Sequence, residues 1–355
     1  MEIRIERIAD EARKPKPDGK SLGFGQIFTD HMLVMPYDAG QGWHDPRVTG
    51  YADFCLDPAA MVFHYGQAIF EGLKAYRGKD GQIRLFRPLA NLERMNSSAA
   101  RLCMPTLPIE TAFEGLKALL CADADWVPSA SGATLYIRPT MIATEAGLGV
   151  RPAKQYLFFI ILSPVGAYYP EGFNPVKIYV TDQYVRAVPG GVGAAKAAGN
   201  YAASIKAAEE AKKEGFTQVL WLDATERRYI EEVGTMNIFF IIGDEVVTPP
   251  LSGSILPGIT RDSVLQLVRD WGHKVVERPV AIDEILAAST NGSLKEAFGT
   301  GTAAVISPVG ALHYQGQDCL INSGKTGALS QRLFDELQAI QYGHAADPHG
   351  WVVRL

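Results

Sequence analysis

GGVGAAKAAGNY, residues Gly190 to Tyr201, is the stretch around which this chain is organised, because it places one lysine among residues too small to shield it. Lys196 is therefore the candidate reactive group. The glycines before it permit backbone conformations that a Cβ would forbid, so main chain can approach a ligand closely. A solvated loop lysine is the ordinary alternative. A phosphate-binding P-loop is rejected, because that motif needs Gly-Lys followed by Ser or Thr, whereas Ala195 and Ala197 flank the lysine.

Length and composition favour two domains, each with its own core. The chain has 355 residues, of which 47% are hydrophobic. Its formal net charge of −5 makes nucleic acid an unexpected partner. No run approaches the roughly 18 apolar residues of a membrane span, so no membrane association is expected. The N-terminal MEIRIERIADEARKPKPDGK lacks the apolar region of a signal peptide.

The cysteines are scattered along the chain. None of them forms a close pair that would suggest zinc ligation, a redox dithiol or a dense disulfide framework. We therefore expect no metal site and a cytoplasmic, reducing compartment. The four cysteines are Cys55, Cys103, Cys121 and Cys319.

The first half of the chain predicts a sheet covered by two helices on one side. Strand and turn signals run from Phe24 to Arg87, with a hairpin around Lys79 to Gly81. Pro88 suits a helix start, and apolar residues then recur at three- and four-residue spacing up to Pro105. The remaining predicted elements are a helix holding Phe113, Leu116 and Leu120, and strands at Thr134 to Ala143 and Tyr156 to Leu162.

SPVGAYYPEGFNP, residues 163–175, is rich in Pro, Gly and aromatic residues and marks the expected domain boundary. The predicted division is a smaller N-terminal domain at residues 1–165, a linker at 166–175 and a larger domain at 176–355. RRYIEEVGTMNIFFIIG is predicted as one strand and SIKAAEEAKKEG as a helix closed by Gly215. A further helix is expected in PGITRDSVLQLVRDWG, with Thr260 or its neighbour at the N-cap, and Leu329, Leu333, Leu337 and Ile340 mark an amphipathic last helix.

A lysine becomes chemically special when it can form an imine with an aldehyde cofactor such as pyridoxal phosphate. That cofactor also needs a carboxylate for its pyridine nitrogen, which Glu232 in EEVGTMN could supply beside a glycine that lets the strand approach the ring. Glu231 is expected to be a solvated strand-end acid. Arg87 in RLFRP offers a forked cation for the phosphate. The helix start at Ile259 and Thr260 and the Thr302 turn in FGTGTAA offer further donors.

The order of these segments resembles that of the branched-chain amino acid aminotransferases. The similar segments cover nearly the whole chain, from about Ser21 to Tyr342, and are FHYGQAIFEGLKAYRG, RLFRP, LYIRP, GGVGAAKAAGNY, QVLWLD, EEVGTMN, TPPLSGSILPGITR and FGTGTAAVISPVG. The resemblance implies a two-domain α/β enzyme of fold type IV, with pyridoxal phosphate in the cleft between the domains, and a homodimer.

The resemblance also implies roles for single residues. Lys196 matches the Schiff-base lysine, Glu232 the partner of the pyridine nitrogen, and Tyr201 the tyrosine that meets the phenolic oxygen. The matching phosphate positions are Arg87, Ile259, Thr260 and Thr302. The matching substrate positions are Phe24, Tyr65, Phe70, Tyr136, Arg138, Thr235 and Ala303.

The expected reaction is transamination of L-leucine, L-isoleucine and L-valine with 2-oxoglutarate, in which Lys196 acts as general base and acid. Arg138 lies within an apolar strand and needs a partner, which a glutamate γ-carboxylate could be, directly or through Tyr136. The small residues around Lys196 would let its strand pass close to a flat ring. The alternatives are D-amino acid transamination, aminodeoxychorismate lysis and a catalytically silent small-molecule binder. The Cys-x-x-Cys pair of some family members is absent, because Ala304 and Ser307 stand near that turn.

Overall fold

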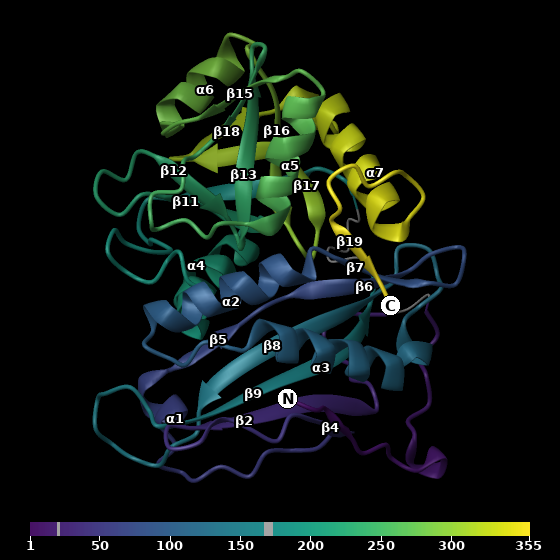
Figure 1. Cartoon of the computed structure of the whole chain (residues 1–355). Coiled ribbons are helices and arrows are strands. Elements are labelled where there is room, and N and C mark those ends of the chain that lie inside the picture. Colours follow the sequence, from purple (N-terminus) through teal and green to yellow (C-terminus); the bar gives the residue numbers. More distant parts are fainter. Residues whose placement is uncertain (20–21, 167–172) are drawn as a thin grey trace. The chain divides into compact units, whose positions relative to one another are not determined.

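The computed structural model describes residues 1–19, 22–166 and 173–355 (Figure 1). These residues form two compact units. The first contains residues up to 166 together with Ala195–Gly199 and Ala339–Leu355, and the second contains residues 173–194 and Asn200–Gln338. The expected linker at 166–175 falls largely on residues 167–172, which lie outside the described residues. The grouping differs from the expected division at Ala195–Gly199 and at the C-terminal segment, since both make their backbone pairings with the first unit.

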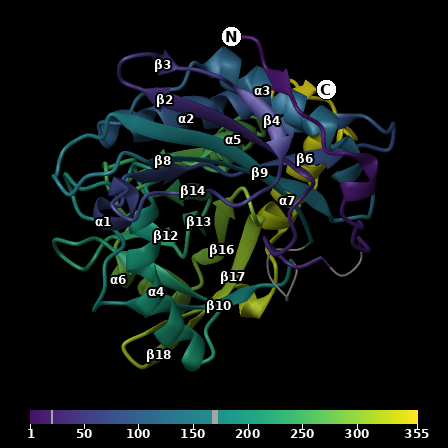
Figure 2. The same cartoon turned by 90° about the horizontal axis from the view of Figure 1, so that it is seen from below.

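The first unit is built on one sheet whose strand order is β1-β4-β2-β9-β8-β6-β7-β19, with β3 on β2 and β5 on β8. Its pairings are antiparallel apart from the parallel pair β1 and β4. Figure 2 shows β2, β9 and β8 side by side. The elements of this unit are β1 (Arg4–Ile5), β2 (His31–Asp38), β3 (Gly42–Trp43), β4 (Arg47–Gly50), α1 (Met61–Tyr65), β5 (Ala68–Phe70), β6 (Leu73–Arg77), β7 (Ile83–Phe86), α2 (Pro88–Arg101), α3 (Ile109–Ala122), β8 (Thr134–Ala143), β9 (Gln155–Val165) and β19 (Val352–Arg354).

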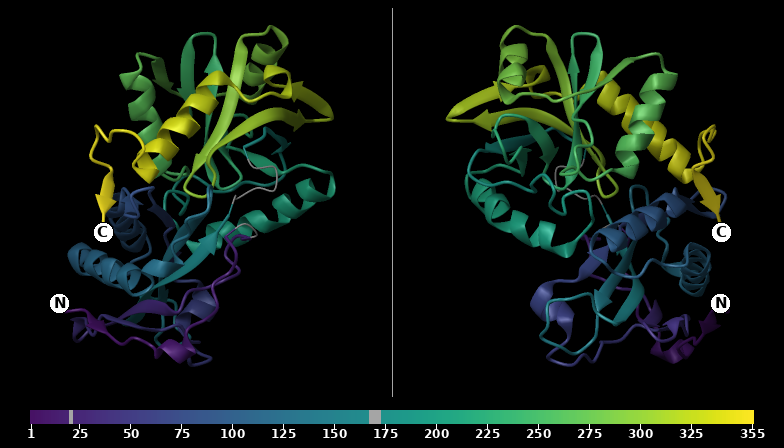
Figure 3. Two further views of the ribbon diagram at one scale, coloured as in Figure 1. Left: turned by 90° about the vertical axis from the view of Figure 1, so that its right-hand side faces the viewer. Right: turned by 60° about the vertical axis from the view of Figure 1, so that its left-hand side comes forward.

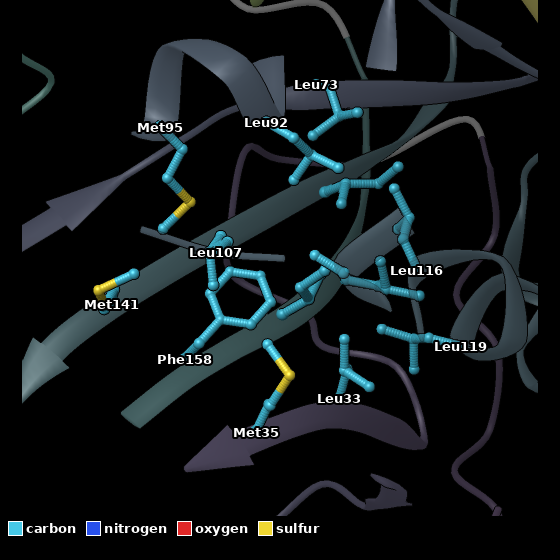
Figure 4. Close-up of a cluster of buried hydrophobic side chains, with 14 of the residues drawn as sticks. Leu33, Met35, Leu73, Leu92, Met95, Leu107, Leu116, Leu119, Met141 and Phe158 are labelled. Atoms are coloured by element: carbon cyan, nitrogen blue, oxygen red, sulfur yellow. The ribbon is translucent and has the colours of Figure 1, made fainter. Parts of the chain in front are cut away.

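The core of the first unit lies between this sheet and helices α2 and α3 (Figure 4). Period-two alternation sends Leu135 and Ile137 of β8 into the core, so Tyr136 and Arg138 lie on the opposite face. Helix α2 begins with Pro88 at its first turn, as predicted. The hairpin of β6 and β7 is confirmed, and so are the two helices on one side of the sheet.

The second unit is built on a mixed sheet of order β12-β11-β10-β17-β16-β13-β14-β15, with β18 on β17. Strand β10 is parallel to both of its neighbours, whereas β13 and β16 are antiparallel. Helices α5 and α6 pack on β16 (Figure 3). The elements are β10 (Val176–Thr181), α4 (Ala198–Lys213), β11 (Gln218–Leu222), β12 (Ile230–Val233), β13 (Met236–Ile242), β14 (Glu245–Thr248), α5 (Ile259–Asp270), β15 (Lys274–Glu277), α6 (Ile282–Thr290), β16 (Leu294–Gly301), β17 (Val305–Tyr314), β18 (Gln317–Leu320) and α7 (Ala328–Tyr342).

Three local predictions are wrong. The stretch RRYIEEVGTMNIFFIIG is two strands, β12 and β13, because Gly234 has a φ of +57° and turns the chain into a hairpin. Helix α4 begins at Ala198, six residues before Ser204, so Lys196 lies in the irregular segment before a helix and not in a strand. The N-cap of α5 is Gly258, and Thr260 lies inside the first turn. By contrast, the amphipathic last helix is confirmed as α7, with Leu333 and Leu337 fully buried.

Within the described ranges, every helix is either too short or too polar to cross a membrane.

Candidate active site

Lys196 is held at the first unit by two backbone contacts. The Phe70 N–H donates to the Lys196 carbonyl oxygen at 3.1 Å, and Ala197 forms an isolated bridge with Ile69 at the end of β5. The Lys196 N–H donates to the Ser98 hydroxyl on α2 at 2.9 Å. The segment therefore lies as an extra short strand partner beside β5, and α4 starts immediately after it.

Aromatic and cationic side chains surround the lysine amine. Lys196 Nζ lies 5.0 Å from the centre of the Phe70 ring, and the Arg138 guanidinium lies 4.6 Å from the same ring. Arg138 Nη2 donates to the Tyr136 hydroxyl at 3.2 Å, and Phe24 packs edge-on against Tyr136 with ring centres 4.9 Å apart. Five residues expected at the active site are thus together in one cluster of the first unit.

Burial makes the amine of Lys196 unusually acidic. Desolvation is the largest cause and lowers the pKa of Lys196 to about 8, assisted by the charge of Arg94 and opposed by that of Glu71. The residue as a whole is only partly buried, yet its amine is closely surrounded by protein atoms. A lysine of this kind is a substantial fraction neutral near pH 8 and can act as a nucleophile and a base.

Arg87, the expected phosphate ligand of the first unit, has a strained backbone. Its φ is +50°, in the left-handed region that a non-glycine residue rarely adopts, and it stands at the N-cap of α2. Its N–H donates to the Trp351 carbonyl at 2.7 Å, and its guanidinium lies 5.5 Å from the centre of the Trp351 ring. The C-terminal segment therefore fixes the conformation of Arg87.

Tyr65, the other expected substrate residue of the first unit, ends the short helix α1. Its hydroxyl donates to the Leu148 carbonyl, and its ring lies near that of His64. The hydrogen bond to Leu148 therefore ties Tyr65 to the 144–152 segment.

Glu232 is fully positioned within the second unit. It is 3% exposed, lies opposite Asn237 in the β12–β13 hairpin and forms an ion pair with Arg186, with Nε and Oε2 3.1 Å apart. Its other oxygen accepts the Leu256 N–H at 2.7 Å, while Asn237 donates to the Leu256 carbonyl at 2.9 Å. The hairpin thus holds the loop that leads into α5.

A small pocket opens beside this carboxylate. Its lining includes three expected site residues, Tyr201, Glu232 and Thr235, and the complete set is Arg186, Asn200, Tyr201, Ser204, Glu232, Gly234 and Thr235. The expectation for Glu231 is wrong: this residue is 6% exposed, it bonds to the Ser254 hydroxyl, and burial raises the pKa of its carboxyl. Consecutive residues of β12 point to opposite faces, and both faces are covered here.

The remaining expected residues lie at two turns of the second unit. Ile259 and Thr260 form the first turn of α5, where backbone N–H groups have no partner within the helix. Thr302 and Ala303 form the turn between β16 and β17. Val305, at the end of this turn, has a φ of +63°, which is a strained conformation for a β-branched side chain. Two residues before Thr302, the buried Thr300 hydroxyl has no hydrogen-bond partner among the described residues.

Sequence reasoning missed several charged residues around these sites. Glu71 and Arg94 form a buried ion pair beside Lys196, and Arg186 pairs with Glu232. Lys74 stands opposite Tyr136 in the sheet, and burial lowers its pKa to about 8. Glu71 and Lys74 both lie in the apolar run AIFEGLKAYRG, and a charge within such a run requires a partner. That signal could have found these two residues.

Known proteins resemble this chain in sequence and in fold. The family described as Amino-transferase class IV matches residues 68–312. Branched-chain-amino-acid aminotransferase 2 of Bacillus subtilis is 56% identical over 353 residues, which are 99% of this chain and 97% of that protein. The branched-chain amino acid aminotransferase of Escherichia coli is 26% identical with a TM-score of 0.75, over 91% of this chain and 98% of that structure. A T.th. branched-chain amino acid aminotransferase complexed with N-(5'-phosphopyridoxyl)-L-glutamate is 25% identical with a TM-score of 0.74, over 90% and 97%.

Proposed function

Because the chain belongs to the class IV aminotransferases, and within them to the branched-chain-amino-acid aminotransferases, we propose that it transfers the amino group of L-leucine, L-isoleucine and L-valine to 2-oxoglutarate. The products are the branched 2-oxo acids and L-glutamate. The observation that carries this proposal is the partly hidden Lys196, whose amine lies against Phe70 and near Arg138. A reactive amine, an apolar ring and a cation are the three groups that such a pair of substrates requires.

The donor groups of the chain fit pyridoxal phosphate. Lys196 offers an amine with a pKa of about 8, and Glu232 offers a carboxylate beside a pocket that Tyr201 also lines. The orphaned hydroxyl of Thr300 and the strained Val305 flank the turn at Thr302, where an anion would supply the missing acceptor. In this assignment Arg87, Ile259, Thr260 and Thr302 hold the phosphate. Bound there, the cofactor supplies an electron-withdrawing ring that acidifies the α-carbon of an amino acid.

The residues of the chain supply positioning and proton transfer. Lys196 Nζ accepts the proton of the substrate's α-carbon and returns it, which its lowered pKa permits near neutral pH. Glu232 keeps a negative charge where a protonated ring nitrogen would need one, and Arg186 fixes the direction of that carboxylate. Thr235 and Ala303 are the proposed contacts for the substrate α-carboxylate.

One pocket has to accept both an alkyl and a carboxylate side chain. Phe70, Phe24 and Tyr136 provide apolar surface for leucine. Arg138 provides the charge for a γ-carboxylate, and its buried Nε has no hydrogen-bond partner in the described residues. An incoming carboxylate would satisfy that donor, whereas the isobutyl group of leucine would pack on the rings.

A transamination panel tests the reaction, stereochemistry and side-chain class together. L-Leu, L-Ile, L-Val, L-Phe and D-Ala are each supplied with 2-oxoglutarate, and glutamate formation is measured. Turnover of the three branched L-amino acids is expected, and Lys196→Ala should lower it by several orders of magnitude. Dominant turnover of D-Ala would assign D-amino acid transamination instead, and full activity of Lys196→Ala would remove the lysine from the mechanism.

We further propose that the enzyme is a cytoplasmic homodimer. The described cysteines are unpaired, and three of them are exposed, which suits a reducing compartment. Around Tyr65, the apolar side chains of Phe63, Leu148 and Val150 are 62%, 67% and 84% exposed, which is a surface that a second subunit could cover. Sedimentation of Val150→Glu against the parent chain tests this, because a monomeric parent would contradict the proposed dimer.

A further inference from the structure

A buried ion pair lies behind Lys196, and we propose that Glu71 and Arg94 are positioning residues that set the charge around the lysine amine. The inference deepens the proposed function, since it rests on Lys196 being the reactive group. Neither residue is among the expected catalytic, cofactor or substrate residues.

The pair has well-defined geometry. Arg94 on α2 donates from Nε and Nη2 to the two carboxylate oxygens of Glu71, both at 2.8 Å. The Glu71 side chain is fully buried, and that of Arg94 is 9% exposed. Asn91, one turn earlier on α2, donates to the same carboxylate at 2.8 Å, and the Gly72 N–H does so at 3.2 Å. The carboxylate therefore has a single orientation.

The elements that carry the pair also hold the lysine. Glu71 directly follows Phe70, whose N–H binds the Lys196 carbonyl and whose ring lies 5.0 Å from the amine. On α2, Ser98 lies one turn after Arg94 and accepts the Lys196 N–H at 2.9 Å. Lys196 is thus fixed relative to both charges through its own backbone, so the distances cannot vary independently.

Stability alone is a weak reason for such a pair. A buried ion pair often contributes little or nothing compared with apolar residues of the same shape. Its charges nevertheless act strongly on a neighbouring buried group, because little water screens them. After burial, which is the largest cause, Arg94 lowers the pKa of Lys196 and Glu71 raises it, while Tyr136 raises it and Arg138 lowers it from β8. The pair therefore places two opposed charges beside one amine.

Competitive labelling measures the amine without any catalytic turnover. The full-length chain is freed of cofactor and exposed to a trace of acetic anhydride between about pH 6 and 11, a range that spans the ordinary pKa of lysine. Acetylation of Lys196 is read by mass spectrometry. Glu71→Gln leaves the positive charge of Arg94 and should lower the labelling midpoint by about one pH unit. Arg94→Met should raise it. Because no turnover is measured, the result stands even if the transamination panel fails.

Two further variants keep the experiment decisive. Asp30→Asn removes a different buried charge of the same unit and should destabilise the protein without moving the Lys196 midpoint. If Glu71→Gln does not fold, Glu71→Asp retains the charge and withdraws it by one methylene, so the midpoint should fall by a smaller amount. An unchanged midpoint in the folded Glu71 variants, or shifts of the same sign in Glu71→Gln and Arg94→Met, would overturn the proposal.

Discussion

Tyr136 contributes a single hydroxyl to its pocket, and that hydroxyl accepts a hydrogen bond from Arg138 at 3.2 Å. Tyr136→Phe keeps the ring against Phe24 and removes this contact. We expect the KM for 2-oxoglutarate to rise about tenfold, since a hydrogen bond to a charged group contributes about 1.5 kcal/mol. The KM for leucine should change much less. Steady-state kinetics with each substrate varied in turn measures both values.

A tyrosine elsewhere in the same unit provides the matched control. The Tyr342 hydroxyl donates to the Ala133 carbonyl at 3.2 Å, so Tyr342→Phe makes the same chemical change at another place. Both KM values should stay at the parent level in that variant. Equal increases for leucine and 2-oxoglutarate in Tyr136→Phe would show that the hydroxyl does not discriminate between the two side chains.

At the level of single residues, the sequence predicts chemistry better than surroundings. Lys196 and Arg138 are identifiable because each is a charge among small or apolar neighbours. The pairing of Glu71 with Arg94 is not, because the two are 23 residues apart and meet only when α2 folds onto β5. Glu231 and Glu232 look alike in sequence, and only the strand pairing shows that both are buried.

The N-terminal segment is the element whose role is least evident in the sequence. In the structure, Asp30 at the start of β2 binds it: Arg13 Nε donates at 2.9 Å and the Lys14 N–H at 2.8 Å, while Trp126 donates at 2.8 Å. Burial raises the pKa of Asp30, but these hydrogen bonds and the charge of Arg13 outweigh it and lower the pKa overall. Residues 13 and 14 are therefore tied to the sheet by an ionised carboxylate.

We expect Asp30→Asn to release this segment. The free energy of unfolding should fall by about 2 kcal/mol at pH 7, because hydrogen bonds to a charged group are lost. The folded-state pKa is lowered, so the stabilisation is complete above the unfolded pKa of roughly 4 and disappears as pH falls below it. Parent and variant should therefore converge in acid. Urea denaturation at several pH values measures the difference, and hydrogen exchange of residues 8–14 locates it.

The control is Asp38→Asn at the other end of the same strand. Asp38 accepts the Gly40 N–H at 2.9 Å and the Gln155 amide at 3.0 Å, which lower its pKa, but it is exposed to solvent. Its loss should have a smaller effect and leave exchange near the N-terminus unchanged. A difference between Asp30→Asn and the parent that persists undiminished in acid would contradict the ionic origin of the effect.

Elements were predictable where the pattern is local and failed where a turn is short. Strand β8 has the predicted bounds, Thr134–Ala143, because its alternation is regular over ten residues. The β12–β13 hairpin was missed because its turn at Gly234 interrupts an apolar run without a polar loop. Helix α4 was predicted to begin too late, because the glycine before Asn200 suggested a loop.

At the scale of the whole molecule, the sequence does not reveal that the chain returns to its first unit twice. The segment 195–199 joins β5, and the C-terminal β19 pairs antiparallel with β7 through Val352 and Phe86. Both returns depend on pairing between residues more than a hundred positions apart, for which neither composition nor periodicity gives a signal. The tail past Tyr342, which has no recognisable motif, completes the edge of a sheet and holds Arg87.

Trp351→Ala tests whether this last return supports the site as well as the fold. Trp351 is 6% exposed, packs edge-on against Phe86 with ring centres 5.5 Å apart, and lies under the Arg87 guanidinium. Its removal should lower the free energy of unfolding by about 3 kcal/mol through loss of buried aromatic surface. Because Arg87 keeps its strained backbone only with this support, affinity for pyridoxal phosphate should fall about tenfold, as expected for one weakened charge-assisted contact. Equilibrium dialysis measures the affinity.

A tryptophan of the second unit separates the two effects. The guanidinium of Arg332 lies 3.7 Å from the centre of the Trp271 ring, so Trp271→Ala also removes an aromatic ring from beneath an arginine. This control should lose stability and bind the cofactor with parent affinity, since neither residue is an expected cofactor contact. If Trp351→Ala is destabilised but binds pyridoxal phosphate as the parent does, Arg87 does not need the C-terminal segment. Weaker binding in Trp351→Ala alone would show that the end of the chain maintains a phosphate ligand located far from it in sequence.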